Sequence, residues 1–165
     1  MLQYGFEDLE SVKKYLGTES LEYDIILIDV DSAQSFEQYN LKTAEQNYFV
    51  TNFDNYSLKK GLEIIGKMQQ KVNMTKILFS KDMLPEEDDY LNFLSFYYAV
   101  EWNQYKAYFP YENGDGSAVI ENQKAAKIRF RDLSQEYRSG LYAICGQIVP
   151  EVKDSELRKI LKKLM

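Results

Sequence analysis

Short apolar segments recur along the chain at intervals that leave room for one helix between them. The clearest is residues 23–30, in which four consecutive aliphatic residues predict a strand buried on both faces, as in parallel sheets. Shorter segments begin 25, 28 and 29 residues after one another, at 48–51, 76–79 and 105–109. This alternation predicts an α/β fold, a three-layer sandwich with a mostly parallel sheet of about four strands flanked by helices.

Helical patterns fill the stretches between and after these segments. Apolar residues recur at helical spacing within 57–70 and 130–149, and Pro85 followed by four acidic residues is typical of a helix start. No linker composition divides the chain. We therefore expect a single α/β domain in residues 1–150, followed by a C-terminal basic amphipathic helix in residues 151–165.

Composition excludes several classes of function. The chain contains no histidine, which excludes Ser-His-Asp catalysis and His-ligated zinc. Cys145 is the only cysteine, so an intrachain disulfide or a cysteine cluster for a metal is excluded too. The net charge of −6 argues against a broad nucleic-acid interface. The sequence starts without a leader pattern and lacks a long apolar run, so we expect a cytoplasmic protein.

Asp29, near the end of the aliphatic run, is the first candidate for a functional residue. Ligands of α/β sheets bind beyond the carboxyl ends of the strands, and an aliphatic run followed by Asp is the form of a Walker B strand that holds Mg²⁺. Asp31 and Ser32 could add oxygen ligands there. An acidic loop that merely caps the next helix would have the same sequence, so both interpretations stay open.

A Walker B strand requires a phosphate-binding loop, and the sequence holds one near match. Residues 61–67 contain two glycines and a lysine at the spacing GxxxxGK, but Met68 replaces the hydroxyl that would bind Mg²⁺. The segment also continues the helical pattern of residues 57–70, whereas a phosphate loop is an open turn. We therefore interpret it as a helix, and the chain as it stands is not expected to hydrolyse nucleotides.

The last fifteen residues are basic on an acidic chain, with five Lys or Arg against three Asp or Glu. Apolar residues recur there at helical spacing, which predicts a short amphipathic helix. Packing on the chain's own domain or on a partner is the favoured role of this helix, and attachment to an anionic membrane is the alternative. Its candidate contact residues are basic: Arg158, Lys159, Lys162 and Lys163.

From residue 23 onward the order of segments resembles the carboxyl-terminal half of ParA/MinD-type (deviant Walker) ATPases. Residues 23–29 are similar to the Walker B strand of that family, and residues 48–54 to a strand and loop near its dimer face. Ser80 stands where an adenine-contacting Asn is common. Pro110 and Tyr111 resemble the stretch that borders the base. The resemblance thus implies a nucleotide or metal site made of Asp29, Asp31, Ser32, Ser80, Pro110 and Tyr111.

The family's amino-terminal part, with its lysine-bearing phosphate loop, has no counterpart in this sequence. The resemblance therefore implies a degenerate or truncated relative, non-catalytic or fragmentary, that acts by protein–protein association in partition, conjugation or secretion-type assembly. No catalytic residue and no cofactor are expected, and Mg-ATP would bind only if a missing amino-terminal part supplied the phosphate loop. The expected partners are another protein or further copies of the chain.

A receiver-like signalling domain is the alternative from a different class. Receivers also carry a phosphoacceptor Asp at the end of a buried central strand, and Asp29 would fill that place, with Lys81 as the lysine of a later strand. Receivers need an acidic pair on an earlier strand as well. The first residues offer Glu7, Asp8 and Glu10 only within a helical pattern.

Overall fold

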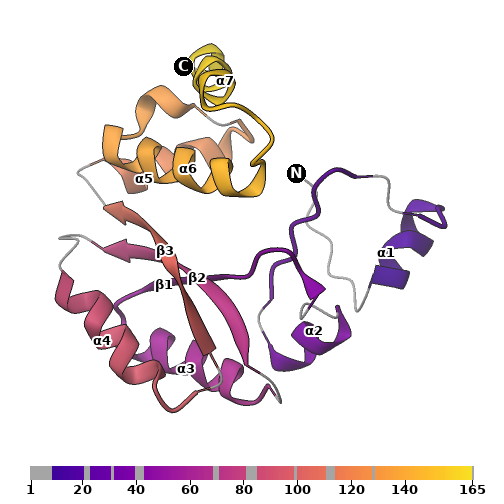
Figure 1. The fold of residues 1–165 in the computed structure, drawn as a ribbon. Helices are drawn as coiled ribbons and strands as arrows, with labels where there is room; N and C mark the ends of the chain where they lie inside the picture. The colour runs from indigo at the N-terminus through magenta and orange to yellow at the C-terminus, as the bar shows by residue number, and fades with distance from the viewer. Residues whose placement is uncertain are drawn as a thin grey trace.

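The computed structural model describes residues 9–20, 23–30, 32–39, 43–68, 71–80, 85–98, 100–110, 114–127 and 129–164. Its centre is an open parallel sheet of three strands in the order β1-β2-β3, namely β1 (Tyr48–Asn52), β2 (Val72–Ser80) and β3 (Val100–Pro110). Two crossover helices, α3 (Asn55–Gly66) and α4 (Pro85–Ser95), lie together over one face of this sheet (Figure 1). The predicted α/β class is confirmed, with three strands among the described residues where about four were expected.

The remaining helices lie at the two ends of the chain. Helix α6 packs on β3, and α7 in turn contacts α6. The elements outside the sheet and its crossovers are α1 (Leu9–Leu16), α2 (Ala33–Gln38), α5 (Asp115–Lys124), the 3-10 helix η2 (Phe130–Asp132), α6 (Gln135–Ile148) and α7 (Asp154–Leu164).

Two apolar cores lie on opposite faces of the sheet, because successive side chains of a strand point to opposite sides. The larger core joins α3 and α4 to the sheet through fully buried leucines, among them Leu62, Leu78 and Leu91. The smaller core joins α6 to the other face, where the rings of Phe79, Phe109 and Tyr137 pack together. The central strand β2 is buried on both faces, which explains why it has apolar side chains on both sides.

The sequence of α3 explains why residues 61–67 form no phosphate loop. Asp54 caps the helix by accepting a hydrogen bond from the Ser57 N–H at 2.8 Å, and the helix continues to Gly66. Gly61 lies in the middle of this helix, where a β-carbon would come within 3.0 Å of the Phe49 ring. The glycine therefore permits close packing of α3 on β1, and the helical interpretation of this segment is confirmed.

The prediction of a strand at residues 23–30 is wrong. These residues belong to no strand, and Ile25, Ile26 and Leu27 are exposed, Leu27 to 77%. Only Ile28 and Val30 pack against the larger core. An aliphatic run has the propensity for a strand, but a strand forms only where another strand offers its backbone for pairing, and none of the described strands does so here.

The basic amphipathic helix predicted at the end of the chain is α7. Its Leu157 is buried, and the Arg158 guanidinium lies 5.5 Å from the centre of the Tyr142 ring of α6. Ile160 of the same helix is half exposed. Helix α7 thus packs on its own chain through part of its apolar face. None of the described helices is long and apolar enough to cross a membrane.

Candidate functional site

The structure places Asp29 outside the strands of the sheet. Asp29 is exposed and lies on the unpaired segment 23–30, so the premise of a Walker B strand is wrong here. Ser32 caps α2, where its hydroxyl accepts a hydrogen bond from the Ser35 N–H at 3.1 Å. Of the two interpretations left open for this loop, helix capping therefore fits Ser32. Asp31 lies outside the described residues.

The other sequence candidates fall at the ends of strands. Ser80 and Pro110 are register partners at the carboxyl ends of β2 and β3, so the structure brings these two positions together. Lys81 and Tyr111 lie outside the described residues. Within the described part of the chain, no group of three or more Cys, Asp or Glu side chains is placed to hold a metal ion. Magnesium binding at Asp29 stays a prediction.

The basic candidates of the tail lie on α7. Arg158 and Lys159 are exposed residues beside the half-exposed Ile160, and the Arg158 guanidinium lies over the Tyr142 ring of α6. For Lys162 and Lys163 the structure places the helix backbone.

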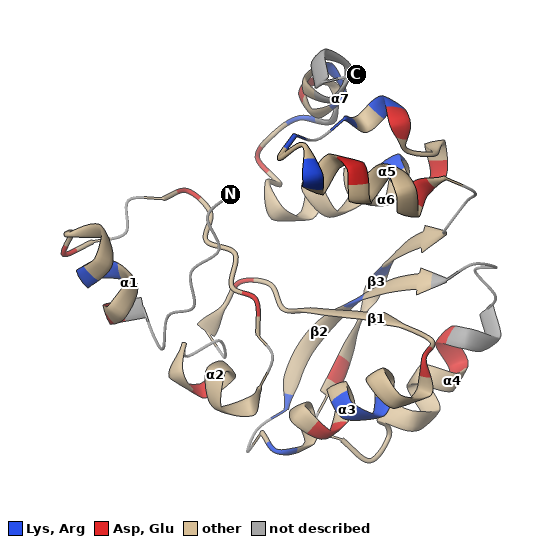
Figure 2. Cartoon of the chain, turned by 180° about the vertical axis from the view of Figure 1, so that it is seen from behind, with Lys and Arg blue, Asp and Glu red and all other residues tan. Residues whose placement is uncertain are grey.

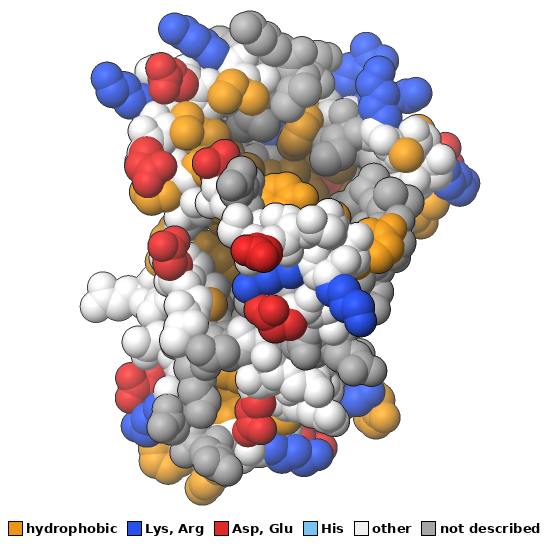
Figure 3. Space-filling view, turned by 90° about the vertical axis from the view of Figure 1, so that its right-hand side faces the viewer, with side chains coloured by type: hydrophobic (Ala, Val, Ile, Leu, Met, Phe, Trp, Pro, Cys, Tyr) orange, Lys and Arg blue, Asp and Glu red, His pale blue; other side chains and the backbone are white. Residues whose placement is uncertain are grey.

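On the side of the molecule that carries α1 and α2, charges of both signs are scattered and hydrophobic side chains show between them (Figure 3).

An open groove of about 320 Å³ lies along β1. It is lined by Phe49, Val50, Thr51, Asn52, Ser57, Gly61 and Phe79. β1 is the first strand of the sheet, and its outer edge pairs with no strand among the described residues. Val50 is 61% exposed in the middle of this strand. The groove therefore combines apolar walls with a row of backbone N–H and C=O groups that no described strand occupies.

The polar side chains near the groove are already hydrogen-bonded within the chain. The Thr51 hydroxyl donates to the Asn52 carbonyl at 2.7 Å, and the Asn52 side chain accepts from the Asp54 N–H at 3.2 Å. Hydrogen bonds from Ser57 hold the pKa of the Asp54 carboxyl below its ordinary value. These side chains are occupied in fixing the turn from β1 into α3. The arrangement suits the binding of an extended polypeptide better than the binding of an ion.

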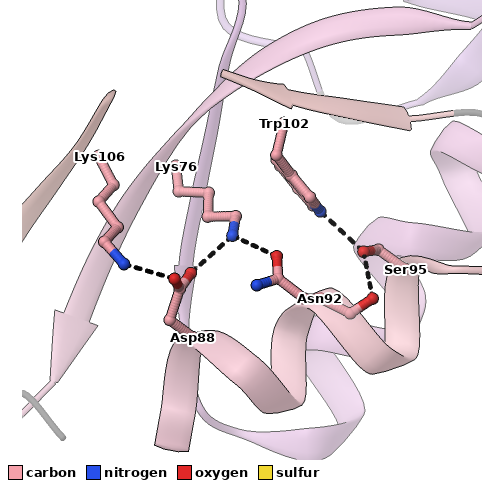
Figure 4. Close-up of polar contacts among 6 residues, drawn as sticks. All are labelled: Lys76, Asp88, Asn92, Ser95, Trp102 and Lys106. Atoms are coloured by element: carbon pink, nitrogen blue, oxygen red, sulfur yellow. Dashed lines mark hydrogen bonds and ion pairs between the residues drawn. The ribbon is translucent and has the colours of Figure 1, made fainter. Parts of the chain in front are cut away.

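A cluster of polar side chains lies between α4 and the sheet, on the face of the sheet that α3 and α4 cover (Figure 4). Lys76 of β2 and Lys106 of β3 are register partners, and both donate to the Asp88 carboxylate, at 2.6 and 2.5 Å. The Lys76 ammonium also donates to Asn92 and lies 5.1 Å from the centre of the Trp102 ring. Lys76 and Asp88 are buried. Two cations and one anion thus bind α4 to two neighbouring strands.

The charges of this cluster stabilise one another. Burial alone would raise the pKa of Asp88, but the hydrogen bonds from Lys106 and Lys76 outweigh it and hold the pKa below its ordinary value. The same bond to Asp88 raises the pKa of Lys106. Among the described residues every buried polar side-chain atom has a hydrogen-bond partner. The cluster is therefore a closed structural network, which fixes the rotation of α4 about its own axis.

Sequence reasoning misses this network. The acids after Pro85 have the pattern of a solvated helix start, yet Asp88 is buried. The available signal is one lysine near the start of each of two apolar strand segments, Lys76 in 76–79 and Lys106 in 105–109, which parallel pairing can bring side by side. A second buried acid is missed as well, since Asp115 accepts hydrogen bonds from the Ser134 N–H and hydroxyl, both at 2.7 Å.

Comparisons with protein-family models, curated proteins and solved structures found no match to this chain. The resemblance to ParA/MinD-type ATPases therefore rests on the sequence segments alone. Function has to be argued from the geometry of the groove and of the exposed surfaces.

Proposed function

We propose that the chain acts by protein–protein association, with the groove along β1 receiving an extended segment of a partner as a further strand of the sheet. The observation that carries this proposal is the outer edge of β1, which is unpaired among the described strands and borders the groove. Addition of a strand to an exposed sheet edge is a common mode of peptide recognition. Backbone hydrogen bonds supply affinity there, and pockets for alternate side chains supply specificity.

The sequence of β1 supports this proposal because it lacks the features that usually protect an edge. Tyr-Phe-Val-Thr-Asn contains no lysine and no proline, and its pairing with β2 runs without a register shift. Proteins commonly blunt exposed edges with charges, prolines or bulges to prevent unwanted pairing. An unblunted apolar edge beside a groove is therefore the surface best suited to take up a strand.

At the family level, we propose a non-catalytic relative of ParA/MinD-type ATPases that works in partition, conjugation or secretion-type assembly. The support is the order of the sequence segments from residue 48 onward together with a parallel α/β sheet, while the Walker B-like segment 23–29 gives none because it is not a strand. The receiver-like alternative needs its phosphoacceptor at the end of a sheet strand. We do not retain it, because Asp29 lies on a segment that is not a strand.

A peptide panel tests the association. The probes are fluorescent ten-residue peptides in which Val or Ile alternates with polar residues, and binding is followed by anisotropy. Wild type should bind members of the panel, and Val50→Lys should weaken this binding at least about tenfold, because a charge on the edge opposes pairing. Ile120→Lys, at an exposed position of α5 outside the groove lining, is the control and should bind as wild type does. Equal binding by both variants, or no binding to any peptide, would refute the edge as the site.

Phosphate release from ATP tests the non-catalytic part separately. Purified protein should give the rate of the buffer control in the presence of Mg²⁺. Turnover that Asp29→Ala abolishes would show that the chain is an enzyme, and the family-level proposal would then be wrong.

A further inference from the structure

Helix α4 packs on the sheet through a side that mixes apolar and polar residues, and it presents an aromatic side to solvent. Asp88, Leu91 and Ser95 recur at helical spacing and are buried. Residues two positions along a helix are rotated by about 200°, so Tyr90 starts a second stripe on the opposite side. This outer stripe and the turn that follows it form what we call the aromatic face, made of Tyr90, Phe93, Phe96 and Tyr97.

The aromatic face has little cover. Phe93, Phe96 and Tyr97 are 67%, 80% and 81% exposed. The rings of Phe96 and Tyr97 meet edge to face, with centroids 5.3 Å apart. An amphipathic helix normally turns its apolar stripe to the core. Here Leu91 faces the core, and the bonds from Asp88 to two lysines hold the same side of α4 on the sheet, which leaves the aromatic stripe in solvent. Several exposed aromatic side chains on one face indicate an interaction surface.

Charge indicates what covers this face. Residues 85–98 contain no Lys or Arg, and of their four acidic residues Asp88 is buried between two lysines whereas Asp89 is exposed. The segment of α7 contains four bases and two acids. Exposed Lys159 precedes Ile160, whose side chain is half exposed. The acidic residues of α4 and the basic residues of α7 lie at opposite ends of the molecule (Figure 2). The α7 of a chain therefore cannot reach the α4 of the same chain.

We propose that the aromatic face of α4 binds the α7 helix of a second copy of this chain. Ile160 covers the rings, while its neighbour Lys159 meets the exposed Asp89 and the ring faces, where cations are attracted. The contact uses two different surfaces, so each copy offers one free end and assembly continues head to tail. This surface is separate from the groove along β1, so the inference goes beyond the proposed function.

Sedimentation velocity on the full chain tests the assembly. At about 50 mM NaCl the average mass should rise with protein concentration beyond that of a dimer, and at about 500 mM NaCl it should fall, because salt screens exposed charges. The double variant Phe93→Ser/Phe96→Ser should weaken assembly at least about tenfold. Tyr56→Ser changes an equally exposed aromatic residue of α3 and is the matched control, with no change expected.

Charge exchange identifies the partner surface. Lys159→Glu and Asp89→Lys should each weaken assembly, because each variant alone places like charges on the two contacting faces. Mixing the two variants should restore assembly, with the variants alternating along it, since the acid introduced on α7 of one copy then faces the lysine introduced on α4 of the next. A mixture that assembles no better than either variant alone would overturn the pairing of Lys159 with Asp89.

Two further outcomes bear on the inference. A dimer that is lost in Phe93→Ser/Phe96→Ser but unaffected by Lys159→Glu would mean that two α4 helices pair, and would overturn the assignment to α7. A monomer at all concentrations would overturn the inference as a whole. Val50→Lys should leave this assembly unchanged, so failure of the assembly is distinguishable from failure of the β1 groove.

Discussion

The two edges of the sheet differ in how they are protected against further pairing. β3 carries Glu101 and Lys106, ends at Pro110, and shifts register against β2 between Trp102 and Lys106. β1 has none of these features. Charges, prolines and bulges discourage the addition of a strand, so the sheet is closed to partners at β3 and open at β1. The comparison supports the proposal that a partner strand adds to the sheet at β1.

The interactions that hold the two edge strands in the fold differ as well. The β3 side is fixed by the buried ions around Asp88 and by close packing of α6, whereas β1 is held by apolar contacts such as Phe49 against Gly61. Substitutions on the β3 side should therefore cost folding stability. Substitutions at the outer edge of β1 should cost binding instead.

The largest expected effect is that of Asp88→Asn. Removing the carboxylate leaves Lys76 buried without its anion, and loss of one partner of a buried pair costs about 3–5 kcal/mol. The free energy of unfolding from urea denaturation measures this loss. Asp89→Asn changes the exposed neighbour and should stay within about 0.5 kcal/mol of wild type. Equal stability of both variants would mean that the ion cluster does not hold α4.

The second-largest expected change in stability comes from a glycine substitution in helix α6. A β-carbon at Gly140 would lie 2.7 Å from the Tyr108 carbonyl oxygen of β3, so Gly140→Ala forces α6 away from the strand and should destabilise the protein by about 1–3 kcal/mol. At Gly146 of the same helix nothing lies within 4 Å. Gly146→Ala should therefore stabilise by about 0.5–1 kcal/mol, because alanine favours helix. Thermal melts of the pair check the opposite signs, and a shared sign would contradict the close approach.

Acid should remove the contribution of Asp88. The pKa of this carboxyl is lowered in the folded protein, so its stabilisation is complete above the unfolded value of 3.8 and is lost as pH falls through the lower folded value. The stability difference between wild type and Asp88→Asn should therefore be constant near neutral pH and shrink below about pH 4. Urea denaturation at a series of pH values measures it. A difference that does not shrink in acid would show that the charge of Asp88 is not responsible.

The smallest effect on stability should come from Val50→Lys. Val50 is mostly exposed, so the substitution should change the free energy of unfolding by no more than about 0.5 kcal/mol. The same variant is expected to lose peptide binding. A large loss of stability would mean that the outer edge of β1 is covered, and the contrast between the two edges would then fail.

Periodicity predicts much of this fold. The segments 48–51, 76–79 and 105–109 lie within the three strands, and the helices expected after Pro85 and near the end of the chain are present. Both β2 and β3 extend further toward their amino ends than the apolar segments indicate, since their first residues are held by pairing rather than by an apolar run. Helix α5 is not predicted, because it has only a weak apolar stripe.

The sites are harder to predict than the elements. The run at 23–30 has the composition of a buried strand, but whether it pairs depends on the position of other strands, which its own residues do not encode. Asp88 resembles a solvated acid until parallel pairing brings Lys76 beside Lys106. The open edge of β1 is equally non-local, because an edge exists only once the order of the strands is known.

Amide hydrogen exchange tests the central claim most directly, because it reports on both edges of the sheet at once. A peptide from the panel that binds wild type is added, and exchange is compared for β1 and β3 with and without it. We predict that the slowing of exchange is concentrated in β1, with β3 unchanged, since only β1 gains a neighbouring strand. Slower exchange in β3, or unchanged exchange in β1 under saturating peptide, would contradict the account.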